Sequence, residues 1–439
     1  MLNSGVCRGK EGREKVCIIS FSPLHRDARV LRQVRYLSPH FDLAVIGFGP
    51  VPEDWQERKE VQWMPILFSQ PKRSTGQKIR YLFQLCGQGR WGELAQRAMM
   101  RNLYLGRLIP DLFERWYWNQ PLFAHALELA TSTHPRVYLA NDWNSLPIAV
   151  EAASRNSARV LFDAHEYAPL EYDNLWWRMN TRPLILHLLR KYLPQVDAFT
   201  TVGPIIARRY QREFKVDPVV IMNASDPIAR HRERTDPELI HLVHHGAAFR
   251  IRRLEHMIEV IRYCDSRYHL HFLLVTEDTE YLDYLQRLAR ERTPGRVHFH
   301  QPVLPKQVVE RISDYDMGIY LLASNAYNDQ MALPNKFFDF IAAGLAVCIG
   351  PSPEMAAMVR KLGLGCVAPS FRPRDMAHTL NRLSWKDISA MQRASLAAAR
   401  EINAQHEMTK FLDIIRVLTR DDQPAQDRHF RIVAEGNLL

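Results

Sequence analysis

Apolar runs and amphipathic stretches alternate along most of the chain. Lys15–Ser22 and Phe41–Gly49 are short apolar runs typical of buried strands, and Ala28–Ser38 between them has the period of an amphipathic helix. The alternation resumes with two strand-like runs at Arg136–Asp142 and Arg159–Glu166. Strands separated by helices predict an α/β fold with doubly wound parallel sheets.

A polar stretch from Met222 to Asp236 interrupts this alternation. After it, a new series of apolar runs begins at Leu239–Gly246 and ends at Leu345–Gly350. At 439 residues the chain is also too long for one ordinary core. We therefore predict an N-terminal tail (1–14), a first Rossmann-like domain (15–224), a linker (225–238), a second Rossmann-like domain (239–400), a terminal helix (401–420) and a tail (421–439).

The chain is basic, with a formal net charge of +10, which favours an anionic partner. One segment concentrates this charge: Lys72–Arg115 has nine basic and three acidic residues, interleaved with aromatics. We expect an insertion at about 72–120, which is either a solvated helical surface or a basic face that rests on an anionic membrane. Nucleic acid is not expected as a partner, because the sequence contains no recognition motif for it.

Several classes are disfavoured by what the sequence lacks. Its six cysteines have no CxxC spacing, so we expect buried thiols in a reducing compartment and neither a zinc site nor disulfides. The N-terminal stretch has no apolar segment typical of a signal peptide. No apolar run approaches the roughly 20 residues that span a bilayer. We expect a cytoplasmic protein.

Candidate ligand-binding residues follow the strands, because ligands of doubly wound sheets bind at the carboxyl ends of the strands. Arg26, Asp27 and Arg29 follow the first strand, where no GxGxxG is present, so a nicotinamide or flavin enzyme is disfavoured. Each of the three is either functional or an ordinary helix-entry residue, with Asp27 as a cap. His165 follows a later strand, a position that favours a role in the cleft over a purely structural one.

The second half offers two cationic helix starts. Gly246 ends a strand and is followed by Arg252 and Arg253, next to the start of a helix. Asn335 and Lys336 open another helix. Helix N-termini and fixed cations hold phosphate groups, so these positions predict a site for a nucleotide diphosphate.

Asp339 lies three residues after Lys336, within reach of the ribose hydroxyls of a nucleotide bound there.

These segments resemble family 4 type glycosyltransferases of the two-domain GT-B fold. The resemblance covers about Lys15 to Leu418 and is carried by five stretches: ISFSPLHRDARVLRQVRYL, DAHEY, VGPIIARRYQREF, LPNKFFDFIAAGLAVCIGPSPEMAAMVRKLGLGCV and, for the terminal helix, SLAAAREINAQHEMTKFLDIIRVL. It implies two Rossmann-like domains that face each other across a cleft, with a C-terminal helix that returns to the first domain. It also implies a nucleotide-sugar donor and no metal or other cofactor.

The resemblance also assigns roles to residues. His165 corresponds to the histidine that contacts the transferred sugar, Arg253, with Arg252 beside it, to the donor-diphosphate cation, and Asp339 to the acid that binds ribose. The family's first acid of this pair falls at Met331, which leaves the transferred sugar and the stereochemical outcome open. We expect Asp329 to supply a catalytic carboxylate nearby.

The function predicted is transfer of a sugar from a nucleotide-sugar to a lipid-linked saccharide or a polysaccharide. It would take place on the inner face of a membrane, in cell-surface polysaccharide biosynthesis, and the family's mode implies retention of configuration. Arg26, Asp27 and Arg29 are expected on the acceptor side. The alternatives are a nucleotide-sugar epimerase of the same fold and a non-catalytic homologue that binds nucleotide-sugars.

Overall fold

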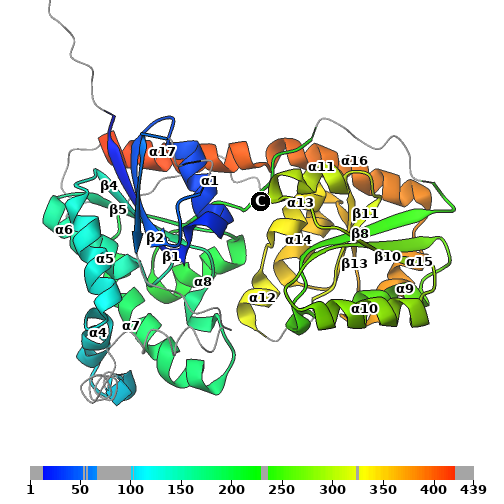
Figure 1. Cartoon of the computed structure of the whole chain (residues 1–439), viewed down its shortest axis with the longest axis horizontal. Helices are drawn as coiled ribbons and strands as arrows, with labels where there is room; N and C mark the ends of the chain where they lie inside the picture. The colour runs from blue at the N-terminus through cyan, green and yellow to red at the C-terminus, as the bar shows by residue number, and fades with distance from the viewer. Residues whose placement is uncertain are drawn as a thin grey trace, which may run out of the picture.

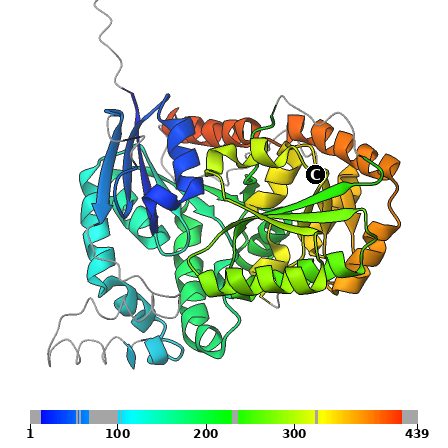
Figure 2. The ribbon, with the colours of Figure 1, turned by 45° about the vertical axis from the view of Figure 1, so that its right-hand side comes forward.

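The computed structural model describes residues 13–52, 55, 58–66, 100–101, 103–228, 236–322 and 326–420, without the side chain of Arg26. The basic aromatic segment predicted at about 72–120 therefore lies outside the described residues up to position 99. In the part that is described, the chain forms two α/β domains, each built on a parallel sheet (Figures 1 and 2).

The first sheet has the order β3-β2-β1-β4-β5-β6-β7 among the described residues, and its strand pairs are parallel. Its strands are β1 (Lys15–Pro23), β2 (Asp42–Phe48), β3 (Val61–Ile66), β4 (Val137–Asn141), β5 (Arg159–Ala164), β6 (Ala198–Thr201) and β7 (Val219–Val220). Its helices are α1 (Ala28–Leu37), α4 (Asp111–Trp118), α5 (Pro121–Ser132), α6 (Leu146–Asn156), α7 (Arg182–Tyr192) and α8 (Pro204–Phe214), with the short helices η1 (Leu24–Arg26), η3 (Ala168–Leu170), η4 (Trp177–Thr181) and η5 (Leu193–Gln195).

The second sheet has the order β10-β9-β8-β11-β12-β13 and is also parallel. Its strands are β8 (Ile240–Ala247), β9 (Tyr268–Val275), β10 (Val297–His300), β11 (Met317–Tyr320), β12 (Ala346–Ile349) and β13 (Gly365–Val367). Its helices are α9 (Glu255–Tyr263), α10 (Thr279–Arg292), α11 (Val308–Ile312), α12 (Tyr327–Met331), α13 (Asn335–Ala342), α14 (Pro353–Leu362), α15 (Pro373–Asn381) and α16 (Trp385–Glu401), with η6 (Arg250–Arg252) and η7 (Pro305–Gln307).

Each sheet is covered on both faces, which explains why its strands are continuous apolar runs. In the first domain, side chains of α4 to α8 pack on one face, and α1 packs on the other. In the second domain, α9, α10 and α15 cover one face, while α11, α13, α14 and α16 cover the other. The predicted fold class is confirmed.

The last helix, α17 (Ala404–Arg420), leaves the second domain and completes the core of the first (Figures 1 and 2). Its buried side chains Phe411, Ile415 and Leu418 belong to the same hydrophobic cluster as Val16 and Ile18 of β1. The predicted return of a C-terminal helix to the first domain is confirmed.

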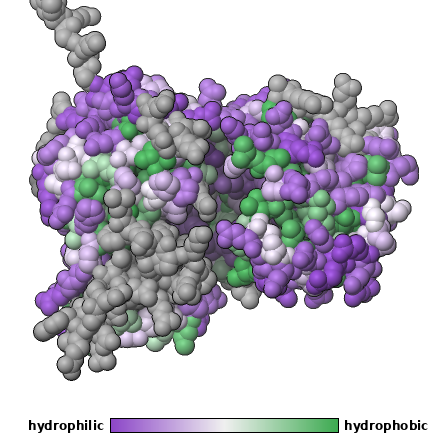
Figure 3. Space-filling view, in the orientation of Figure 1, coloured by the Kyte–Doolittle hydropathy of each residue, from purple (hydrophilic) through white to green (hydrophobic). Residues whose placement is uncertain are grey.

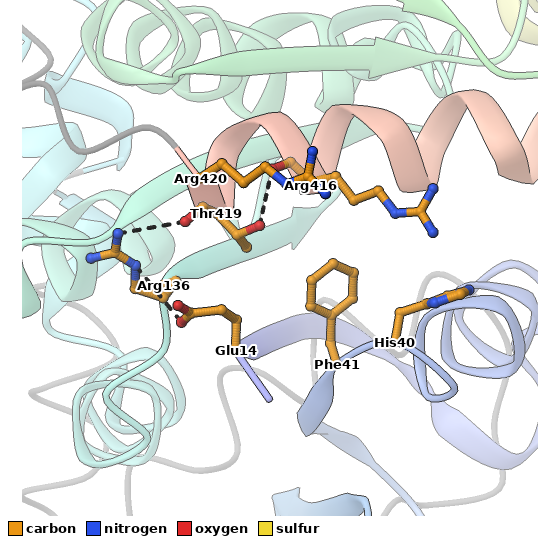
Figure 4. A pocket seen from close by; sticks show the side chains of 7 residues that line it. All are labelled: Glu14, His40, Phe41, Arg136, Arg416, Thr419 and Arg420. Atoms are coloured by element: carbon orange, nitrogen blue, oxygen red, sulfur yellow. Dashed lines mark hydrogen bonds and ion pairs between the residues drawn. The ribbon is translucent and has the colours of Figure 1, made fainter. Parts of the chain in front are cut away.

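A surface pocket of about 500 Å³ marks where α17 ends on the first domain (Figure 4). Arg136 lies 3.8 Å from the carboxylate of Glu14 and donates to the carbonyl oxygen of Thr419 at 3.5 Å. Glu14 and Arg136 precede β1 and β4, so the pocket lies at the amino ends of these parallel strands. Ligands of such sheets bind at the opposite, carboxyl ends.

Two side chains of the second domain hold the first domain. Glu354, at the start of α14, is buried and accepts from the backbone N–H of Ile205 at 3.1 Å, near the start of α8. Asn328, on α12, accepts from the N–H of Tyr167 at 3.2 Å and donates to the Glu166 carboxylate at 3.0 Å. Figure 3 shows the surface hollowed between the two domains.

A row of histidines crosses one edge of the second sheet. Nδ1 of His241 lies 2.9 Å from Nε2 of His271, whose Nδ1 lies 2.9 Å from Nε2 of His300. A second pair joins His269 to His298 at 3.2 Å. Burial first, and then the neighbouring imidazoles, lower the pKa of His271 to about 2.

This row should make the second domain sensitive to acid. Between the pKa of about 2 in the folded state and its ordinary 6.5, the unfolded chain binds a proton that folded His271 does not. The stability is then fully present above pH 6.5 and is lost as the pH falls below it. We expect His271→Gln to show a smaller drop in melting temperature between pH 7.5 and pH 5 than the wild type.

The exposed His378 on α15 provides the control, because His378→Gln removes a histidine outside the row. The two variants should differ in the slope of melting temperature against pH, as measured by circular dichroism. Equal slopes for the wild type and His271→Gln would show that the row does not set the acid sensitivity.

Candidate functional site

The carboxyl end of β8 and the start of α13 bring Lys336 against the backbone of the second domain. Gly246 has φ +107°, a turn that favours glycine, and a Cβ there would lie at an ordinary contact distance of 3.5 Å from Nζ of Lys336. Nζ of Lys336 is 3.2 Å from Nε2 of His244. His244 Nδ1 is 2.9 Å from the carbonyl oxygen of Ile319, so Nδ1 donates and Nε2 accepts from Lys336. The buried ammonium group is thus fixed.

The protonation of Lys336 should respond to a bound anion. Burial, followed by repulsion from Arg252, lowers the pKa of Lys336 to about 7, although Asp339 favours the charged form. Arg252 is half-buried and donates to the carbonyl oxygen of Ala247 at 3.1 Å. A phosphate group beside both cations would relieve their repulsion and favour full protonation of Lys336.

Asp339 lies on the same helix and faces the interdomain linker. Its Oδ1 accepts from Ser225 at 2.5 Å, and its Oδ2 lies 3.4 Å from Nε2 of His245. Burial raises the pKa of Asp339 to about 6, although Ser225, Arg32 and Lys336 favour the carboxylate. Nε2 of His245 is buried and has no hydrogen-bond partner among the described residues, because its approach to Asp339 lacks hydrogen-bond geometry.

The two remaining predicted donor residues are more exposed. Asn335 is the first residue of α13, next to the backbone N–H groups that an α-helix leaves without intrahelical partners. Arg253 has a left-handed backbone with φ +49°, and its exposed side chain contributes to lowering the pKa of His256. Of these two arginines, Arg252 is the one whose positive charge contributes to the lowered pKa of Lys336, after burial.

The opposite half of the site is organised by Asp163, which is fully buried at the end of β5. Arg29 of α1 binds it through two nitrogens, at 2.6 and 2.5 Å. Thr200 of β6 and Gln33 of α1 donate to it at 2.7 and 2.8 Å. Burial opposes the charge of Asp163, but Arg29 and His165 outweigh it and keep the pKa of this carboxyl below its usual value.

His165 lies between two carboxylates. Its Nδ1 is 3.2 Å from Asp142, and its Nε2 is 3.5 Å from Asp163. Burial favours the neutral ring, but the attraction and hydrogen bond of Asp142, with the bond to Asp163, raise the pKa of His165 to about 10. The side chain is 20% exposed, so the imidazolium ion is partly accessible at the carboxyl end of β5.

The three residues predicted on the acceptor side have different positions. Asp27 caps α1 by accepting from the N–H groups of Arg29 and Val30, at 3.0 and 3.1 Å, which is the structural alternative named above. Arg29 binds Asp163 and donates to Asn223 at 2.9 Å. Arg26 lies in η1, and its side chain is outside the described residues.

Two carboxylates in the cleft were not predicted. Asp142 follows β4, has φ +64° and is 42% exposed, so a non-glycine residue is held in a strained backbone. Glu166 extends into the cleft and binds Asn328. Desolvation by the surrounding protein, and then repulsion from Asp142, raise the pKa of Glu166 to about 7. The predicted catalytic residue Asp329 adds to this repulsion. The strand-end reasoning that selected His165 applies equally to Asp142.

Met331, which takes the place of the family's first acid, packs against the hydrophobic core of the first domain. So does Tyr327, and the guanidinium of Arg209 lies over the rings of both Tyr167 and Tyr327, at 4.7 and 4.6 Å. α12 therefore serves as a contact between the domains.

Charges connect the two halves across the cleft. Arg32 of α1 lies within the electrostatic influence of both Arg29 and Asp339. Burial, followed by repulsion from Arg29, lowers the pKa of Arg32, whereas Asp339 raises it. Among the residues described, no three histidine, cysteine or acidic side chains gather to hold a metal ion.

Comparison with known proteins gives a likeness of fold. No protein-family model and no curated protein sequence matches the chain. Solved structures do match over 92–93% of it: HepE of Anabaena with UDP and glucose (TM-score 0.62, 12% identity, 100% of that chain), sucrose-phosphate synthase from Thermosynechococcus elongatus (0.65, 11%, 100%) and the lipopolysaccharide outer core galactosyltransferase WaaB (0.57, 13%, 99%).

These structures are GT-B glycosyltransferases, so the chain has the GT-B fold. Identities this low establish the fold alone, and membership in family 4 stays a prediction.

The lowered pKa of Lys336 predicts that nucleotide binding takes up a proton. A diphosphate would raise this pKa above its value of about 7 in the free protein. Protons would then be taken up at pH 7.5–8.5, and affinity would fall as the pH rises through this range. Titration of a nucleoside diphosphate by calorimetry, in buffers of different ionisation enthalpy, measures this uptake.

The control pair is Lys336→Met and Lys361→Met, since Lys361 is an exposed lysine at the end of α14. Proton uptake should disappear in the first variant and persist in the second. Binding heats that do not depend on the buffer in the wild type would contradict the role assigned to Lys336.

Proposed function

We propose that this protein is a glycosyltransferase that moves a sugar from a nucleotide-sugar donor to a lipid-linked saccharide or polysaccharide. The observation that carries this proposal is the buried Lys336 beside Gly246 and Arg252, at the start of a helix in the second domain. Cations at a helix N-terminus suit a diphosphate, and His165 with Asp142 lies on the first-domain side.

The chemistry follows from the charge that develops during transfer. As the bond between the sugar and the diphosphate breaks, negative charge grows on the diphosphate, and fixed cations stabilise it without reorganising. Lys336 and Arg252 would supply this charge. In the proposed transfer these two cations act without a metal or cofactor.

The donor nucleotide is proposed from two observations, one for its base and one for its ribose. HepE binds UDP and UDP-glucose in its solved structures, and Asp339 offers this chain a carboxylate for ribose hydroxyls. UDP is therefore the first ligand to test, in a thermal-shift series with GDP, dTDP, ADP and CMP, because a ligand of the folded state raises its melting temperature.

The acceptor and the stereochemistry are proposed from the sequence resemblance. It supports transfer with retention, in which the leaving phosphate helps to remove the proton of the acceptor hydroxyl. It also supports a role in polysaccharide biosynthesis at the cytoplasmic face of a membrane. The nuclear magnetic resonance coupling of the anomeric proton in the product tests retention directly.

One experiment separates this function from its alternatives. A radiolabelled donor panel is incubated with the protein and a membrane extract, and both free nucleoside diphosphate and new glycoside are measured. Both products should appear together. An isomerised nucleotide-sugar would instead identify an epimerase. Binding without turnover would identify a non-catalytic homologue, an alternative raised by Met331.

We expect Lys336→Ala to weaken nucleotide affinity or the transfer rate about ten- to a hundredfold, because it removes a charge-assisted contact worth about 1.5–3 kcal/mol. Arg252→Ala should have a similar effect. Both cations would act on one developing charge, so the double variant should be non-additive. Calorimetry and steady-state kinetics measure both parameters.

Arg250→Ala is the matched control. Arg250 belongs to the same short helix, but it is exposed and pairs with Asp278 at 2.7 Å. Unchanged affinity and rate in both Lys336→Ala and Arg252→Ala would end the diphosphate proposal.

A further prediction concerns His165. His165→Ala should lower kcat far more than it weakens nucleotide binding, because this imidazolium belongs to the first domain, across the cleft from Lys336. Kinetics and calorimetry on one preparation give both numbers. A loss of nucleotide affinity as large as the loss of kcat would place His165 on the nucleotide or show that its role is structural.

A further inference from the structure

Half of the large hydrophobic side chains that are exposed in the described residues belong to two short segments of the first domain, 104–109 and 172–179. In the first segment, Leu108 is 81% and Ile109 54% exposed, in the turn before α4. In the second, Leu175 is 67% exposed, just before η4. The exposed members are Tyr104, Leu105, Leu108, Ile109, Tyr172, Leu175 and Met179.

The two segments form one surface, although more than 60 residues separate them in the sequence. The ring of Tyr104 packs edge-to-face on that of Trp176, with centroids 5.9 Å apart. Tyr172 packs on Trp177 in the same way, at 4.8 Å. Figure 1 places α4 and α7, which follow the two segments, at the same lower end of the first domain. Figure 3 shows hydrophobic surface at this end. We call the seven exposed side chains the apolar tip.

We infer that the apolar tip inserts into the headgroup region of an anionic bilayer. This inference rests on the proposed function, for which it names the membrane-facing surface. Leu108 and Ile109 stand in a turn, a position that is usually polar on a surface exposed only to water, and Leu175 stands at the start of a helical segment. The tip also combines aliphatic side chains with Tyr104 and Tyr172, and the partly buried Trp176 packs against Tyr104. Tyrosine and tryptophan are enriched at membrane interfaces.

The charge around the tip fits anionic lipid. In the described parts of residues 100–115 and 170–182, exposed arginines outnumber exposed acids: Arg101, Arg107, Arg115 and Arg178 against Asp111 and Asp173. The chain as a whole carries a net charge of +10. Apolar side chains that insert, surrounded by arginines that bind headgroups, form the combination by which peripheral proteins hold an anionic surface.

The tip is continuous with the cleft, which suits a lipid-linked acceptor. From Glu166, which binds Asn328 across the cleft, the chain passes through η3 directly to Tyr172 and Leu175. The indole of Trp177 donates to the carbonyl oxygen of Pro169 at 3.2 Å and fixes this segment. Insertion of the tip would therefore place a membrane close to the first-domain side of the cleft.

The test is flotation of the full chain with two kinds of vesicle, phosphatidylcholine alone and a mixture with phosphatidylglycerol. The wild type should bind the anionic vesicles. The double variant Leu108→Asp/Leu175→Asp should bind them at least about tenfold more weakly, because two exposed leucines no longer enter the lipid. Leu304→Asp is the control, since Leu304 is a 58% exposed leucine just before η7 in the second domain.

A milder pair, Leu108→Ser/Leu175→Ser, should show the same direction if the aspartate variant unfolds. The inference is overturned if the wild type does not bind vesicles, if both double variants bind like the wild type, or if Leu304→Asp loses as much binding. It is also overturned if light scattering shows a wild-type dimer that the double variants dissociate, because the tip would then cover a second copy.

The thermal shift with UDP keeps this test separate from the proposed function. Loss of vesicle binding with an intact UDP shift supports the tip alone. A wild type that binds vesicles but responds to no nucleotide would leave the tip standing and remove the transferase.

Discussion

The first domain depends on a buried ion pair between Arg29 and Asp163. Asp163 is fully buried, and charges that are buried without a partner are among the costliest groups in a protein. Breaking such a pair by removing one member typically costs about 3–5 kcal/mol. The pair joins α1 to β5, and through Thr200 and Asn223 it reaches β6 and the segment that follows β7. The position of His165 follows from it, because Asp163 orients one of the ring nitrogens.

The two halves of the site hold their charges in opposite ways. In the first domain, carboxylates keep His165 protonated well above neutral pH. In the second, burial leaves Lys336 close to losing its proton and Asp339 close to gaining one. Lys336 and Asp339 can therefore change protonation when a charged ligand binds to the second domain. His165 in the first domain keeps its charge.

Much of the fold could be predicted because it depends on local patterns. The alternation of apolar runs and amphipathic stretches predicted both parallel sheets, and the resemblance to GT-B glycosyltransferases implied the returning helix, which spans Ala404–Arg420. Positions at strand ends could also be selected, which is why Gly246 and His165 were found.

What these residues contact could not be predicted in the same way. Lys336 binds His244, 92 positions earlier, and Arg29 binds Asp163, 134 positions later. No periodicity reports such pairs, because they result from how whole elements pack. Glu166 was missed for the same reason, because its importance comes from its contact with α12. Asp142 directly follows β4 and could have been selected by its position, although its backbone strain could not be predicted.

The return of α17 to the first sheet has a consequence for biosynthesis. A ribosome releases the chain from the N-terminus, and domains generally fold as they emerge. Here one face of the first domain is covered by Phe411 and Ile415, which are made after the entire second domain. Part of the apolar face of the first sheet therefore stays uncovered while the second domain is synthesised. The exposed stretches are Val16–Ile19 and Leu43–Ile46, and a chaperone would have to shield them.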